Sequence, residues 1–245
     1  MKLFRYSCGI VQRIFEKYKR IKSSSETVLM FHQVNNDLIK WNDPFCSITE
    51  KSFCQLLEKI QDCTFGTTTD LVKKQQLENE KTIIYITFDD AYDDVYYNCY
   101  PILREKEIPY TIFIATSLLD KPGYLSTYMI REMIKNSLCT IGAHTVTHSP
   151  LRYLGEDEVK YELSVSKKFL QEKFGVIVDE FAYPYGSIYA CSLNNVYSAM
   201  EMYSIAFSTI DSNLPANIIG KYWFLPRRNV NEENWEKIVR NLICH

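Results

Sequence analysis

The chain has 245 residues, of which 46% are hydrophobic and 14% aromatic, so it can bury the core of one domain as large as an α/β barrel. A formal net charge of −2 gives no general case for nucleic-acid binding, and we expect no nucleic-acid partner. The charge is uneven, because residues 1–22 carry seven Lys or Arg against one Glu. The segment is therefore basic and the remainder of the chain acidic.

Residues 1–22 have apolar side chains at near-helical spacing with basic side chains between them. This pattern predicts a basic amphipathic helix ahead of a single catalytic domain at 23–245. The helix could pack on the domain or lie on a membrane surface, and the spacing leaves both open. The segment lacks the apolar run of a signal peptide, and the eight cysteines form no CxxC pair. We therefore expect reduced thiols in a cytoplasmic protein, with peripheral membrane contact as the added option.

Apolar runs rich in β-branched and aromatic residues alternate with helical patterns along the chain. The predicted strands are 27–34, 82–88, 110–116, 139–145, 176–184, 202–209 and 222–230. The predicted helices are 50–61, 94–106, 126–136, 156–173, 191–202 and 231–243. This alternation favours an α/β fold with a mainly parallel sheet. The nearly continuous apolar character of the strands predicts burial on both faces, as in a barrel.

Polar side chains follow or close several of these strands. They are His32, Asp89, Asp90, His144, His148 and Tyr185. In a barrel of parallel strands the carboxyl ends meet at one rim, which carries the chemistry of such folds. The adjacent acids Asp89 and Asp90 could simply cap the helix that follows. Because several strand ends are decorated at the same rim, we favour a bound cation instead.

The stretch "GAHTVTHSP" places His144 and His148 four residues apart, so both can reach one metal ion. Together with Asp90 on the same rim they form a candidate set of three ligands. Two imidazoles and one carboxylate leave room for water, as in a catalytic zinc site. We therefore expect a divalent metal, with Zn²⁺ as the ion that this donor set favours.

Three stretches, "TFDDAYDD", "HTVTHSPL" and "FAYPYGS", resemble in order the motifs of the polysaccharide deacetylases, carbohydrate esterase family 4. The resemblance runs from "VLMFHQV" to "LPRRNV" and is strongest to the branch of poly-N-acetylglucosamine and capsule-type deacetylases. It implies a distorted (β/α)7-type barrel, a divalent metal, and hydrolysis of the N-acetyl group of an amino sugar in a glycan or glycolipid.

The resemblance also implies roles for individual residues. Asp90, His144 and His148 match the metal ligands, and Asp89 matches the catalytic base. Tyr185 matches the residue whose backbone N–H helps to hold the oxyanion. Elementary chemistry agrees, because an acetamide is unreactive and its hydrolysis needs an activated water and stabilisation of the developing negative charge.

Two positions depart from the family pattern. Ala91 stands where many members have Gly, which implies a slightly different turn. Ala182 stands where the commoner motif has an Arg that orients the base, which puts activation of the base in doubt. We expect Arg227 to supply the missing charge, although Arg227 or Arg228 could equally be a solvated cation at a strand end.

The leaving amine needs a proton, and with His144 and His148 assigned to the metal only His32 and His245 remain. "LMFHQV" resembles the early strand of the capsule-type branch, in which the late histidine motif of the family is permuted to the front. We therefore expect His32 to be the general acid. The alternatives are that His32 is a core histidine, or that His245 takes the role in spite of its terminal position.

Four aromatic residues, Tyr92, Tyr183, Tyr185 and Trp223, could stack on sugar rings near the rim, although packing alone could also place them there. Two other functions stay open: a metal-dependent amidohydrolase acting on a non-sugar amide, and a non-catalytic carbohydrate-binding relic. The sequence leaves the glycan, its linkage and the oligomeric state undetermined.

Overall fold

A computed structural model of the chain describes residues 26–36, 43–73, 82–214 and 222–243. The predicted helix at 1–22 and His245 lie outside these residues and stay predictions. Within the described ranges no helix is both long and apolar enough to cross a membrane. The six cysteines in these ranges are all free thiols.

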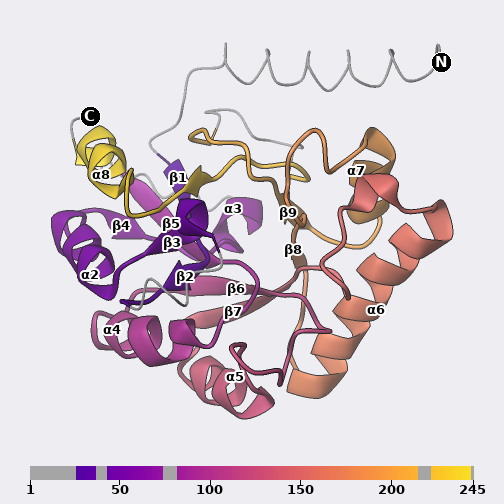
Figure 1. Cartoon of the computed structure of the whole chain (residues 1–245), viewed down its shortest axis with the longest axis horizontal. Helices are drawn as coiled ribbons and strands as arrows, with labels where there is room; N and C mark the ends of the chain where they lie inside the picture. The colour runs from indigo at the N-terminus through magenta and orange to yellow at the C-terminus, as the bar shows by residue number, and fades with distance from the viewer. Residues whose placement is uncertain (1–25, 37–42, 74–81, 215–221, 244–245) are drawn as a thin grey trace.

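The core of the fold is a curled, parallel sheet with the strand order β10-β1-β5-β6-β7-β8-β9, and β4 pairs with the start of β5 (Figure 1). The strands are β1 (Glu26–Phe31), β4 (Thr64–Phe65), β5 (Ile83–Phe88), β6 (Tyr110–Ile114), β7 (Cys139–Ala143), β8 (Glu180–Ala182), β9 (Ile205–Phe207) and β10 (Arg228–Asn229). A separate pair is formed by β2 (Gln33–Val34) and β3 (Ser47–Ile48). All seven predicted strands therefore contribute to the sheet.

Helices surround this sheet (Figure 1). They are α2 (Glu50–Lys59), α3 (Asp70–Lys73), α4 (Tyr100–Glu105), α5 (Thr127–Met133), α6 (Glu156–Phe174), α7 (Leu193–Met200) and α8 (Trp235–Ile243). Several begin at side-chain caps, such as Thr49 for α2 and Ser126 for α5. The six predicted helices are present, although 94–106 divides into a π-helical turn at Val95–Cys99 followed by α4.

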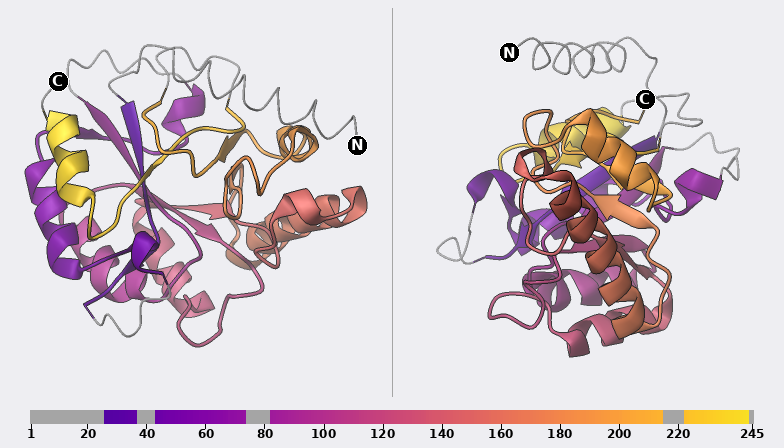
Figure 2. Two further views of the ribbon diagram at one scale, coloured as in Figure 1. Left: turned by 45° about the horizontal axis from the view of Figure 1, so that its top comes forward. Right: turned by 90° about the vertical axis from the view of Figure 1, so that its right-hand side faces the viewer.

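The barrel is closed by one largely irregular segment, residues 222–229, which pairs with β9 and ends in β10 (Figure 2). Ala206 N–H donates to Tyr222 O, and Leu225 pairs with Phe207 in parallel register. A few residues later, Arg228 pairs with Leu29 of β1. The predicted strand at 222–230 is thus regular only at its end, where it completes the ring that the resemblance implies.

Burial on both faces of the strands, as predicted for a barrel, is clearest in β5, whose six residues are all buried. On one side Phe88 stacks on Phe31 at 5.5 Å between ring centroids and meets Tyr110 edge-on at 6.0 Å. On the other side Tyr85 joins the inner cluster that includes Phe113 and Phe207. Packing on both faces of the sheet therefore fixes the strands whose ends form the rim.

The segment carrying His32 is fastened to the helical region that follows β5. Val34 N–H donates to Asp94 Oδ2 (3.1 Å), and Asn98 Nδ2 donates to Val34 O (2.6 Å). Asp94 is 6% exposed, and its burial raises the pKa of the carboxyl to about 7. Asp94, the last acid of "DDAYDD", therefore positions β2 rather than facing solvent.

Asp94→Asn should change how stability depends on pH. The folded pKa of Asp94, about 7, lies above the ordinary carboxyl value of 3.8, so the folded state keeps a proton that the unfolded chain loses. The stability of the natural protein therefore falls as pH rises across that window. The Asn variant can still accept the Val34 N–H but does not titrate. The difference between its melting temperature and that of the natural protein should therefore shift in favour of the variant between pH 5 and pH 8.

Thermal unfolding at several pH values measures this gain, with Asp93→Asn as the control at the neighbouring carboxylate. Parallel pH curves for Asp94→Asn and the natural protein would contradict the assignment of a buried, titrating Asp94.

Candidate metal centre

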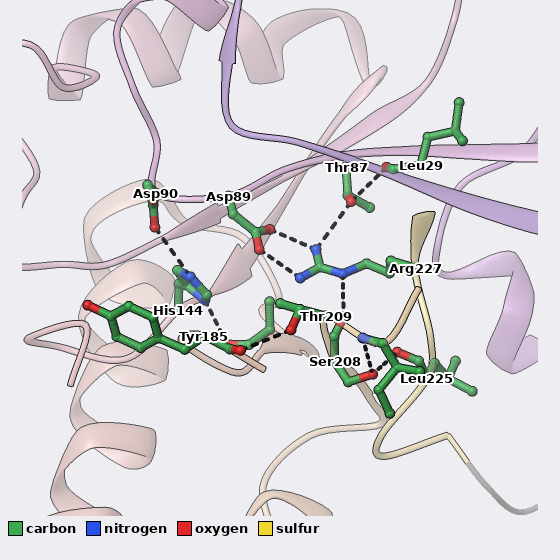
Figure 3. Close-up of polar contacts among 12 residues, drawn as sticks. Leu29, Thr87, Asp89, Asp90, His144, Tyr185, Ser208, Thr209, Leu225 and Arg227 are labelled. Carbon is green, nitrogen blue, oxygen red and sulfur yellow. Dashed lines mark hydrogen bonds and ion pairs between the residues drawn. The ribbon is translucent and has the colours of Figure 1, made fainter. Parts of the chain in front are cut away.

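Two neighbouring aspartates leave β5 in different directions (Figure 3). Asp89 still continues the ladder, because its N–H donates to Phe31 O at 2.9 Å. Asp90 and Ala91 then adopt left-handed backbone conformations with φ of 67° and 61°. Such conformations are costly for residues other than Gly and occur at functional sites. Ala91, which is buried, thus forms a turn with a positive φ at the position where the sequence resemblance implies Gly in many members.

Asp89 is paired with Arg227 inside the barrel (Figure 3). The Arg227 guanidinium donates from both terminal nitrogens to the two Asp89 carboxylate oxygens, each at 2.7 Å. Its Nε donates to Ser208 O at 3.0 Å. Asp89 is 1% exposed and Arg227 0%, so the pair is withdrawn from solvent. Burial alone would raise the pKa of Asp89, but Arg227 outweighs it and holds the pKa below its ordinary value.

Arg227 lies in the closing segment, whereas the resemblance implies a motif arginine at position 182. The residues around its guanidinium show how it reaches Asp89 from there. Its guanidinium lies 5.5 Å from the ring centre of Phe113 and 5.8 Å from that of Phe207. Ala182 belongs to the same buried cluster as these two rings. Arg228, the alternative, instead contacts Asn213 and Asp211 and is partly exposed. A small residue at 182 thus coexists with an arginine that reaches Asp89 from the closing segment.

The ring of His144 is fixed by one hydrogen bond to the backbone. Its Nδ1 lies 2.7 Å from Ala182 O, a group that can only accept, so Nδ1 carries the proton. Nε2 is therefore left with a lone pair that points into the pocket. A backbone carbonyl that fixes the tautomer in this way is a standard partner of metal-ligating histidines.

The donor atoms of His144, His148 and Asp90 converge on one point. The two Nε2 atoms are 3.2 Å apart, and Asp90 Oδ1 lies 3.0 Å from Nε2 of His148 and 3.4 Å from Nε2 of His144. Ligands of a tetrahedral zinc ion are about 3.3 Å apart, given bonds of about 2.0 Å. Two imidazole lone pairs and a carboxylate at such spacing fit a cation between them.

A carboxylate from α6 holds the loop that carries these histidines. Glu162 Oε2 accepts from the N–H groups of Val146 (2.7 Å) and Thr147 (2.9 Å), and Oε1 accepts from Thr147 Oγ1 (2.8 Å). Glu162 is 5% exposed. His148, on the same loop, has a φ of 62°. Glu162 therefore stabilises a strained loop, a role that sequence analysis missed because the residue lies within an ordinary helical pattern.

A pocket of about 510 Å³ opens over this cluster. Its lining includes His32, Asp89, Asp90, His144, His148 and Tyr185. His32 follows β1, and its buried Nδ1 has no hydrogen-bond partner within the described chain. Burial lowers the pKa of His32, against the opposing charges of Asp89 and Asp90. The structure thus brings every predicted catalytic and metal-binding residue to this rim, with Arg227 directly behind Asp89.

The aromatic residues are divided between pocket and core. Tyr92 lines the pocket, where its ring stacks on Tyr124 at 5.2 Å; sequence analysis did not identify Tyr124. The prediction that Tyr183 and Trp223 stack on sugars needs correction. Tyr183 is 0% exposed, and its hydroxyl donates to Trp223 O. Trp223 donates its indole N–H to Tyr203 O, before the start of β9 and thus away from the rim.

A family model described as polysaccharide deacetylase matches residues 76–204, just over half of the chain. The chain belongs to the polysaccharide deacetylase family. The predicted resemblance is thereby confirmed, and the matched stretch contains both the acidic motif and the histidine loop.

Known proteins are similar to this chain in sequence and in fold. A poly-beta-1,6-N-acetyl-D-glucosamine N-deacetylase of Staphylococcus aureus is 27% identical over 196 residues, covering 74% of this chain and 66% of its own. The chain spans 59% and 66% of the first curated relatives it matches.

Two solved structures share the fold at 21% identity. The deacetylase PplD of Streptococcus pyogenes, solved in complex with acetate, has a TM-score of 0.79, with 90% of this chain and 99% of PplD covered. IcaB of Ammonifex degensii has a TM-score of 0.77, with 91% and 98% covered. These structures confirm the predicted barrel.

Glu162→Gln should weaken metal binding. The amide offers one acceptor oxygen in place of two and turns an NH₂ group toward the loop donors, so the histidine loop loses part of its support. We expect the affinity for Zn²⁺ to fall about 10- to 100-fold. Competition with a chromophoric chelator measures it, and Glu156→Gln, on the exposed face of the same helix, is the matched control. Equal affinities for both variants would refute the role of Glu162.

Arg227→Ala should cost about 3–5 kcal/mol of folding stability, because it leaves the Asp89 carboxylate buried without a partner. Arg228→Ala, which removes a partly exposed pair, should cost at most about 1 kcal/mol. Adding Ala182→Arg to Arg227→Ala should recover part of the loss, since Ala182 borders the same inner cluster. Chemical denaturation checks all three variants. A double variant no more stable than Arg227→Ala would show that position 182 does not reach Asp89.

Proposed function

We propose that the protein is a metal-dependent N-deacetylase that hydrolyses the N-acetyl group of an amino sugar within a glycan. The observation that carries the proposal is the arrangement of two adjacent carboxylates in one pocket. Asp90 converges with His144 and His148, while Asp89 is held as a carboxylate by Arg227. One acid is thus placed to hold a cation and its neighbour to accept a proton.

Asp90, His144 and His148 would hold the ion, which when bound lowers the pKa of a water molecule and polarises the acetyl carbonyl. Asp89 would take the proton from the attacking water. Its lowered pKa keeps it ionised at neutral pH, and the two bonds from Arg227 fix the orientation of its carboxylate. Each carboxylate oxygen has a further lone pair, so the ion pair leaves Asp89 able to accept that proton.

His32 and Tyr185 are proposed to act on the two ends of the breaking amide bond. Burial lowers the pKa of His32, so the imidazole starts neutral. It would first receive the proton that Asp89 takes from the water and then pass it to the leaving amine. The Tyr185 N–H finds no acceptor within the described residues, and Tyr185 has a φ of 58° at the edge of the pocket. We assign it to the developing oxyanion.

Zinc is the ion we propose, because two imidazoles and one carboxylate form the donor set of open, catalytic zinc sites. A poly-N-acetylglucosamine chain is the substrate class that we favour, and the name of the Staphylococcus aureus relative supports it. Tyr92, on the pocket wall, is a candidate for contact with the sugar. A cytoplasmic location and membrane contact through residues 1–22 stay predictions.

Acetate release from N-acetylglucosamine oligomers, with and without chelator, tests the proposal. We expect release that stops with chelator and returns with Zn²⁺. Asp90→Ala should lose both metal and activity, whereas Asp89→Asn and His32→Ala should keep the metal but lose most activity. Metal content by elemental analysis separates the two classes of variant.

The same assay decides between the proposal and its rivals. Faster release from simple acetamides than from amino sugars would indicate an amidohydrolase of another class. A protein that holds zinc but releases no acetate from any of these compounds would be a binding relic. Full turnover by Asp89→Asn would remove Asp89 from the role of base.

A further inference from the structure

A short turn at the edge of the pocket presents an aromatic ring to solvent. Residues Pro44–Cys46 form a 3₁₀ turn between Asp43 and β3. Asp43 and Cys46 line the pocket, and Phe45 between them is 69% exposed. Neither the proposed chemistry nor the packing of the core uses this ring.

The backbone of Phe45 is held from both sides. Its N–H donates to Asp43 Oδ1 at 2.9 Å. Its carbonyl accepts from Asn229 Nδ2 (2.8 Å) and Asn231 Nδ2 (2.9 Å), at and just beyond the end of the segment that closes the barrel. Ser47 Oγ donates to Asp43 O at 2.7 Å, which tightens the same turn. The exposed ring thus stands on a backbone that side chains from two regions fix in place.

The hydrogen bonds that fix its backbone distinguish Phe45 from an ordinary exposed aromatic residue. Single apolar side chains on a surface are common and need no explanation. Rings with few rotatable bonds on a rigid backbone, however, bind with a small entropy cost, which suits them to recognition. Asn229, one of the two anchors, itself lines the pocket, so the turn is tied directly to the site.

We propose that Phe45 is a subsite in which the ring stacks on the sugar next to the one whose acetamide enters the pocket. This inference rests on the proposed function, and it makes an oligomeric glycan rather than a single amino sugar the preferred substrate. The apolar C–H face of a pyranose ring matches a phenyl face, while its hydroxyl groups remain available to polar neighbours. Asp43, which is exposed and accepts from the Phe45 N–H, is such a neighbour.

A lipid surface is the other occupant that an exposed Phe would suit. The Asp43 carboxylate next to the ring opposes it, because anionic membranes attract basic segments and repel acidic ones. The position on the rim of the pocket also favours a ligand that extends out of the pocket itself. We therefore commit to the sugar.

Phe45→Ala should raise KM for a β-1,6-linked N-acetylglucosamine pentamer about two- to tenfold and leave kcat nearly unchanged. Hydrolysis of a small fluorogenic acetate ester, which is too short to reach Phe45, should be unaffected. Phe45→Trp should restore the KM for the pentamer. The melting temperature should stay within experimental error, because the ring is mostly exposed. Tyr197→Ala on α7, where the ring is 60% exposed, is the matched control.

Calorimetric titration of the zinc-loaded Asp89→Asn protein with the pentamer, with and without Phe45→Ala, measures the same contact without turnover. Equal affinities, or equal KM values in an active enzyme, would overturn the subsite. Loss of binding to vesicles of anionic lipid in Phe45→Ala, with KM for the pentamer unchanged, would assign the ring to a membrane instead. Absence of acetate release by the natural protein from every amino sugar would overturn the proposed function, whereas the Phe45 comparison tests the subsite.

Discussion

The buried ion pair between Asp89 and Arg227 is the interaction on which the rest of the site depends. Neither charge could remain in the barrel interior alone, because an unpaired buried ion costs several kcal/mol. Asp89 directly follows β5, an interior strand of the sheet, and Arg227 belongs to the segment that closes the ring. The contact that keeps Asp89 ionised is therefore also a contact that ties the closing segment to an interior strand of the sheet.

Backbone strain lets two adjacent carboxylates do different work. Left-handed conformations at Asp90 and Ala91 separate the two side chains, and His148 and Tyr185 have the same conformation on neighbouring loops. The surrounding bonds hold these conformations in place: Glu162 stabilises the histidine loop, and Leu125 N–H donates to Ala91 O. Rigid strands and well-supported loops together place the functional groups before any ligand arrives.

The strands and the polar residues at their ends could be predicted from the sequence, because apolar runs and parallel topology together place the strand ends on one rim. Contacts between distant residues were harder to predict. Glu162 looks like any helix residue until it meets the loop, and nothing local distinguishes Arg227 from Arg228. Tyr183 shows the opposite error: the motif places it near the rim, but strand alternation turns its ring into the core. Phe45 escaped notice because exposure and backbone anchoring depend on tertiary structure.

The position of Arg227 in the chain has a consequence for biosynthesis. Asp89 and its partner are 138 residues apart. A ribosome adds about 5–20 residues per second, so roughly 7–28 seconds pass between the synthesis of the two. During that interval the strands up to β9 can emerge with the acid still unpaired and the ring open. A nascent chain therefore lacks the ion pair that orients the proposed base, and the proposed hydrolysis requires that the closing segment first leave the ribosomal tunnel and dock.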